Sequence, residues 1–219
     1  MVKKYEGILT MTNTRIASQK SSPEPQTRVP KRQRGHERVA VLLEAAARVF
    51  LEKGYDAATM TEIAAAANSS IGSLYQFFPT KLLLAEALHI DRLQRLNSGL
   101  ADLAEKTRGK GAAEIGDAIF TRFGRFIEDY QEFPVLAARR DVPKERKAKS
   151  RAELRTSITA LLKNAEPSVE RDVDLLGALV LELLRIVVAA ANDPDGSGDP
   201  RLVGELRRML RKRLEEVTP

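Results

Sequence analysis

The stretch TMTEIAAAANSSIGSLYQFFPTK, residues 59–81, constrains the fold most, because two helical patterns meet there at a short break. Thr59 lies three residues before Glu62, which is the capping-box pattern that starts a helix. Asn68 tolerates the left-handed conformation that ends a helix, and Ser70 can cap the next one. The sequence therefore predicts two short helices joined by a tight turn, which is a helix-turn-helix.

A longer helix is predicted in front of this motif, from about Glu37 to Lys53. In RVAVLLEAAARVFLEKGY the apolar side chains recur every three or four residues, which places them on one face of a helix. They are Val39, Leu42, Leu43, Ala46, Val49 and Phe50. Gly54 accepts a positive φ after the last turn, and Tyr55 can fold back onto the apolar stripe.

The second helix of the motif can be divided into faces at 3.6 residues per turn. Its core side is expected to carry Ile71, Leu74 and Phe78, while Gly72, Ser73 and Gln76 point away. A helix of this kind fits the major groove of DNA, where a Gln amide can pair with adenine and a Gly lets the backbone approach the bases.

Two aromatic residues lie on the flanks of the same helix. The hydroxyl of Tyr75 can reach a phosphate, and the ring of Phe77 can touch a thymine methyl group. The alternative is that both rings belong to the core of a plain three-helix packing.

The net charge of +6 comes entirely from the first 38 residues, which hold nine basic and three acidic side chains. Residues 1–35 are rich in Ser, Thr, Gln and Pro, and we expect a disordered basic tail. The tail either is merely solvated or contacts a polyanion such as DNA. The segment KRQRGHER next to the fold, with Arg34, is the better candidate for contact.

Residues 38–88 resemble the DNA-binding domain of TetR-family transcriptional regulators at every landmark: an Ala-rich first helix, Phe then Gly-Tyr, a Thr-capped IA..A helix, a Ser-capped helix with Leu-Tyr, and a following Lys. The resemblance implies that Thr59, Tyr75 and Lys81 contact phosphates. It also implies that the groove is faced by Ser70, Ile71, Gly72, Ser73 and Gln76. Asn68 and Ser69 depart from the usual Gly and Val, and Phe77 replaces a common His.

The remainder of the chain alternates helical runs with short breaks and shows no sustained strand pattern, so the chain is predicted to be all-α. We expect the helix-turn-helix domain at residues 36–82 and a second domain at 83–219. The resemblance implies that this second domain senses a small molecule and holds a dimer together.

The run VDLLGALVLELLRIVVAAA, residues 173–191, is apolar on nearly every face and must be buried on more than one side. A partner subunit could cover it. The family resemblance implies that this run and residues 202–217 form a four-helix bundle, which dimerises the chain through its last two helices. The alternative is a bundle core within one chain.

Candidate effector contacts lie in the second domain, namely Phe120, Phe123, Ile127, Tyr130, Leu183 and Arg185. The apolar members are also ordinary core residues. Arg185 places a guanidinium within the apolar run 173–191, where it needs a partner. The partner is either Glu182, one turn earlier, or an acidic effector.

Other classes of protein find little support in the sequence. There is no Cys, only His36 and His89 are present, and we find no nucleophile motif, phosphate loop or metal-spaced cluster. We therefore expect no catalysis, metal or cofactor, and a cytoplasmic protein without a membrane segment. The predicted function is a homodimeric DNA-binding regulator that represses transcription from a palindromic operator until a small-molecule effector releases it. The alternative is a ligand-binding or scaffolding protein that no longer binds operator DNA.

Overall fold

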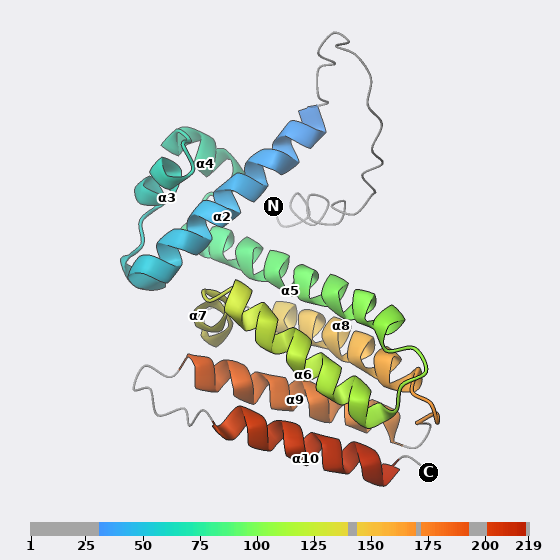
Figure 1. Cartoon of the computed structure of the whole chain (residues 1–219). Helices are drawn as coiled ribbons and strands as arrows, with labels where there is room; N and C mark the ends of the chain where they lie inside the picture. Colours follow the sequence, from blue (N-terminus) through green and yellow to red (C-terminus); the bar gives the residue numbers. More distant parts are fainter. Residues whose placement is uncertain (1–30, 140–143, 170–171, 193–200, 218–219) are drawn as a thin grey trace, which may run out of the picture. The chain divides into compact units, whose positions relative to one another are not determined.

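The structure is a computed structural model that describes residues 31–139, 144–169, 172–192 and 201–217. Within these ranges the chain forms nine α-helices and no strand, which confirms the predicted all-α class (Figure 1). The helices are α2 (Lys31–Ala57), α3 (Met60–Ala66), α4 (Ile71–Phe77), α5 (Lys81–Lys106), α6 (Ala112–Asp129), α7 (Phe133–Ala138), α8 (Lys144–Lys163), α9 (Val173–Ala191) and α10 (Arg201–Val217).

The chain divides into two compact units, one up to Asp91 and one from Arg92. The division falls within α5, so this helix supplies residues to both units. The part of the expected N-terminal tail up to residue 30 lies outside the described residues.

In the N-terminal unit, α2 carries the predicted apolar stripe, and all six of its members are at most 5 % exposed. The helix begins at Lys31, earlier than predicted, because KRQRGHE consists mostly of residues that favour a helix and holds no stop signal. Gly54 interrupts the helix with φ of 75°, and the ring centroids of Phe50 and Tyr55 lie 5.3 Å apart. The predicted turn and the return of Tyr55 onto the stripe are both confirmed.

The short helices α3 and α4 follow, with α3 packed against α2 and α4 against α3. Met60, Ile63 and Ala64 form the buried side of α3. Arg48 of α2 donates a hydrogen bond of 2.8 Å to the carbonyl oxygen of Ala66, which ties the end of α3 to the long helix.

The C-terminal unit is a helical bundle in which α8 packs on α9 and α6 packs on α10 (Figure 1). Two glycines allow these close contacts. A Cβ atom added to Gly177 would overlap Thr159 of α8, and one added to Gly116 would lie 2.5 Å from Leu214 of α10. Within the described chain, no helix combines the length and the apolar character that crossing a bilayer requires.

The helix α9 is covered on one side and apolar on the other. Its buried side consists of Val173, Leu176, Gly177, Val180, Leu181, Leu183, Leu184 and Val187. Leu175 is 64 % exposed and Ile186 is 44 % exposed, with half-buried Leu179 between them on the same stripe. The bundle therefore buries only part of the apolar surface that the sequence places on α9.

A buried ion pair joins α5 to the beginning of α7. Arg92 Nε donates to Glu132 Oε1 at 2.7 Å, and the two side chains are 1 % and 6 % exposed. The Arg92 guanidinium also lies 4.4 Å from the ring centroid of Tyr130. This pair is not among the sequence predictions. Its one signal is that Arg92 lies at the i, i+4 spacing between Leu88 and Leu96, where an apolar residue would be expected.

Candidate functional site

The helix α4 is anchored on one side and presents the other to solvent. Leu74 and Phe78 are 0 % and 2 % exposed, whereas Gly72, Tyr75 and Gln76 are exposed, Tyr75 by 48 %. An added Cβ on Gly72 would meet nothing within 4 Å. These three residues are therefore accessible to the major groove of DNA. The alternative that makes Tyr75 a core aromatic is wrong.

Two residues of α4 differ from the expected faces. Ile71 is 38 % exposed, so its assignment to the core side is wrong, and it lies instead beside the outward positions. Ser73, which was expected to point away, is half-buried, whereas the half-buried Phe77 agrees with its expected place on a flank. The reason is that α4 is only seven residues long, so Leu74 and the C-cap residue Phe78 suffice to attach it and the first turn remains open.

The turn before α4 has the predicted chemistry. Asn68 adopts φ of 48°, the left-handed conformation. Ser70 caps α4 by accepting a hydrogen bond of 3.2 Å from the backbone N–H of Ser73. Arg38 of α2 donates to the Ser69 hydroxyl at 3.4 Å. The Ser70 cap is a local bond that fixes the first turn of α4, and the bond from Arg38 ties the turn to α2.

The predicted capping box at the start of α3 is confirmed. The Thr59 hydroxyl accepts from the backbone N–H of Glu62 at 3.2 Å and donates to Glu62 Oε2 at 2.8 Å, while the Thr59 N–H donates to the same oxygen at 3.0 Å. Lys53 Nζ donates to Glu62 Oε1 at 2.5 Å. Thr59 is exposed, but its hydroxyl hydrogen is engaged, so a phosphate would have to compete with Glu62 for it.

The same contacts change the acidity of the carboxyl group. Hydrogen bonds from Lys53, and then from the side chain and backbone of Thr59, lower the pKa of Glu62 from 4.5 to about 2. The Glu62 side chain is 38 % exposed, so solvent screening limits the energetic effect.

The stability of the N-terminal unit is expected to depend on the charge of Glu62 between about pH 4.5 and about pH 2. A carboxyl whose pKa is lowered in the folded state stabilises the fold above its unfolded pKa, and this contribution is lost as the pH falls through the folded pKa. Glu62→Gln keeps a capping side chain and removes the charge. In urea unfolding at several pH values, the wild type should be more stable than this variant at neutral pH, and the difference in midpoint should shrink as the pH falls. A difference in midpoint that does not change with pH would contradict the lowered pKa of Glu62.

Lys81 is held in a cage of backbone carbonyl groups at the end of α2. Its ammonium group donates to the oxygens of Tyr55, Asp56 and Ala58 at 2.8, 2.9 and 2.8 Å, and lies 4.5 Å from the centroid of the Tyr55 ring. An ammonium group has three donors, and these three bonds use them all. In this arrangement Lys81 closes the end of α2 and has no donor left for a phosphate.

Arg34 is exposed in the first turns of α2. The structure thus brings Thr59, Lys81 and the α4 residues into one compact unit with Arg34, on the elements that the sequence predicted. The side chains gathered there are hydroxyl, amide, aromatic and basic groups, which can bind phosphates and base edges.

The six candidate effector residues occupy different environments in the C-terminal unit. Phe120, Phe123 and Leu183 are 4–8 % exposed within the core, and Ile127 and Tyr130 are half-buried against it. Arg185 instead lies on the exposed side of α9, 46 % accessible, where it pairs with Glu182 at 2.5 Å. Five of the candidates are therefore close to one apolar interior, whereas Arg185 has the structural partner that the sequence offered.

Among the described residues no group of three or more His, Asp or Glu could hold a metal ion.

Residues 42–88 match the family described as bacterial regulatory proteins, tetR family. Among curated proteins, no relative matches the chain in sequence.

Several solved structures are similar to this chain over most of its length. A TetR-family transcriptional regulator from Streptomyces coelicolor is 22 % identical, with a TM-score of 0.62 over 82 % of this chain and 99 % of that one. A transcriptional regulator from Cytophaga hutchinsonii is 19 % identical, with a TM-score of 0.67 over 83 % and 98 %. FadR from Bacillus subtilis, crystallised with stearoyl-CoA, is 16 % identical, with a TM-score of 0.61 over 80 % and 96 %.

These findings confirm the resemblance to TetR-family regulators that residues 38–88 indicated. They also confirm the predicted architecture, a helix-turn-helix domain followed by a larger helical domain.

Proposed function

We propose that this TetR-like protein is a DNA-binding transcriptional regulator that occupies a palindromic operator as a homodimer and represses transcription until a small molecule binds. The observation that carries the proposal is the presentation of α4. Gly72, Tyr75 and Gln76 are exposed together on a short helix, while Leu74 and Phe78 attach that helix to the N-terminal unit.

The side chains on α4 match the chemistry of a base pair and its backbone. The Gln76 amide can donate to and accept from the adenine edge, and the exposed Gly72 leaves room for the bases. The Tyr75 hydroxyl can donate to a phosphate, which fixes the position of the helix without reading sequence. Arg34 and the basic residues before it would add attraction to the DNA that does not depend on sequence.

The dimer would form through α9 and α10. Leu175 and Ile186 of α9 and Met209 of α10 are 64 %, 44 % and 58 % exposed, an apolar surface that a second copy of the chain would cover. A two-fold axis through such a surface would give two copies of α4 for two half-sites of a palindrome.

The effector would bind in the C-terminal unit, next to the aromatic side chains of α6. Phe126 lies between Phe123 and Tyr130, with ring centroids 6.0 and 5.0 Å away, so an effector there should have an apolar part. The acyl-CoA in the structure of the Bacillus subtilis neighbour is consistent with this chemistry. Effector and DNA would then change each other's affinity by the same factor.

Gln76→Ala is expected to weaken operator binding by about 1–3 kcal/mol, because it removes the bidentate contact with a base. Tyr75→Phe removes only a hydroxyl and should cost about 1 kcal/mol. Both variants should dimerise like the wild type, and Gln131→Ala, an exposed glutamine of the C-terminal unit, is the matched control. The measurement is a gel shift at several salt concentrations on the promoter region next to the protein's own gene.

The result also separates the two candidate functions. A regulator should lose affinity steeply as the salt concentration rises, because binding releases counterions. If the wild type bound this DNA no better than an unrelated duplex, the ligand-binding or scaffolding alternative would be favoured. If both α4 variants bound like the wild type, the assignment of α4 to the groove would be wrong.

A further inference from the structure

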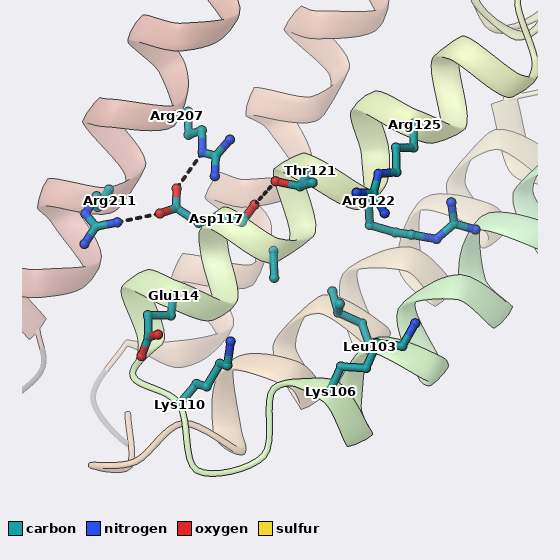
Figure 2. Close-up of a pocket in the computed structure, with 11 residues that line it drawn as sticks. Leu103, Lys106, Lys110, Glu114, Asp117, Thr121, Arg122, Arg125, Arg207 and Arg211 are labelled. Atoms are coloured by element: carbon teal, nitrogen blue, oxygen red, sulfur yellow. Dashed lines mark hydrogen bonds and ion pairs between the residues drawn. The ribbon is translucent and has the colours of Figure 1, made fainter.

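A strongly basic surface lies in the C-terminal unit, and none of the aromatic side chains of α6 lines it. A trough of about 480 Å³ runs along α6, between the end of α5 and α10 (Figure 2). On α6 its lining residues recur every three or four positions, from Glu114 through Asp117 and Thr121 to Arg125, so they share one face of the helix. None of the six candidate effector residues lines this trough.

The charges that line the trough are unbalanced. Six cationic side chains face two carboxylates, an excess of four positive charges. The cationic side chains are Lys106, Lys110, Arg122, Arg125, Arg207 and Arg211. Because like charges repel, gathering them around one trough costs free energy unless an anion offsets the repulsion.

The two carboxylates compensate only part of this charge. Asp117 accepts from Arg207 Nε at 2.6 Å and from Arg211 Nη1 at 2.5 Å, a network that also joins α6 to α10. Glu114 accepts from the backbone N–H of Gly111 at 3.3 Å and so caps α6. Each guanidinium has five N–H donors, and Asp117 takes one from each arginine. Arg211 Nε also donates to Glu215 Oε1 at 3.0 Å, a carboxylate that does not line the trough.

The backbone holds the lysine end of the trough in place. The Lys110 N–H donates to the Thr107 oxygen at 3.1 Å, and the Glu166 N–H donates to the Lys110 oxygen at 2.9 Å. Gly109, with φ of 73°, permits the turn between them. The backbone that carries Lys110 is therefore fixed, so a ligand would have to order only the exposed side chain on binding.

We propose that this trough binds a small anion that carries two or more linked phosphate groups, as in inorganic triphosphate or a nucleoside triphosphate. The volume lies within the usual range of small-molecule sites, about 300–1,000 Å³. Arginine guanidinium and lysine ammonium groups are the side chains that bind phosphate oxygens. A ligand with several linked phosphates can contact several separated cations at once, which a ligand with a single carboxylate cannot do. Leu103 and Ala118 supply an apolar floor on which an organic part could rest.

The test is calorimetric titration of the full chain with inorganic triphosphate and, separately, with ATP. The variant is Lys106→Gln/Lys110→Gln, which leaves the Asp117 network intact. We expect it to weaken triphosphate binding by about tenfold or more, since two nearby charges are removed. The matched control is Arg108→Gln/Arg151→Gln, which also removes two charges, both at positions that do not line the trough. Arg108 pairs with Glu105 at 2.9 Å and does not line the trough, so binding should change by less than about threefold.

The basic N-terminal tail is the same in all these proteins, so the difference between variant and control reports on the trough alone. Equal binding of triphosphate by the variant, the control and the wild type would overturn the proposal. If the variant lost affinity for an unrelated DNA duplex but not for triphosphate or ATP, the surface would be a nucleic-acid contact and the proposal would again be wrong. Tighter binding of ATP than of triphosphate would show that the apolar floor is used, whereas equal affinities would identify the phosphate chain as the whole ligand.

Discussion

Arg92→Met is expected to destabilise the C-terminal unit by about 3–5 kcal/mol, because it leaves the Glu132 carboxylate buried without its partner. Glu132 is 6 % exposed and Arg92 is 1 % exposed, so water cannot replace either group in the pair. Removal of the guanidinium also ends its contact with the ring of Tyr130. The measurement is urea unfolding of the full chain, followed by circular dichroism.

The double variant Arg92→Met/Glu132→Leu separates the cost of an unpaired charge from the value of the pair. A buried ion pair replaced on both sides by apolar groups often leaves stability unchanged or increases it. We therefore expect the double variant to recover most of the loss. Arg108→Met, which breaks an exposed pair with Glu105, should cost less than about 1 kcal/mol. If the single variant at Arg92 were as mild as this control, the pair would not be buried as described.

Lys81→Met should destabilise the N-terminal unit by about 2–4 kcal/mol, because three carbonyl groups at the end of α2 lose a charged donor. Methionine keeps the length of the side chain but cannot donate a hydrogen bond. Lys163→Met is the control, since this lysine is exposed in the last turn of α8. Thermal and urea unfolding of the three proteins measure the effect.

The same variant decides between two roles for Lys81. The family resemblance implies a phosphate contact, which predicts a loss of DNA affinity with unchanged stability. The carbonyl cage predicts a loss of stability, with weaker DNA binding only as its consequence. A Lys81→Met protein that unfolds like the wild type but binds operator weakly would contradict the cage.

The parts of the site that depend on neighbouring residues could be predicted from the sequence. Thr59 and Glu62 form the expected capping box, Ser70 caps α4, and Asn68 adopts the left-handed conformation. Each of these features is decided by backbone groups within about four residues, so the local sequence contains all the partners. The buried stripe of α2 belongs to the same class, since helical spacing alone sets which side chains share a face.

The parts that depend on distant residues could not be predicted in this way. Lys81 meets carbonyl groups that lie 23–26 residues earlier, and Arg92 meets Glu132 forty residues later. The spacing from Leu74 predicts Ile71 on the core side, but the rest of the unit does not cover the first turn of α4. Arg185 was expected among apolar groups because its helix is apolar, yet it lies on the side that the bundle leaves open.

The sequence by itself determined that the chain is all-α, how the helix-turn-helix begins and turns, and which family it resembles, because these features rest on short-range periodicity and capping. The tertiary structure alone decided which charged groups are buried together, which face of α9 stays open, and that six cationic side chains from α5, the following loop, α6 and α10 line one trough. The physical reason is that burial and electrostatic pairing depend on how helices pack, and packing brings together residues whose separation along the chain carries no periodic signal.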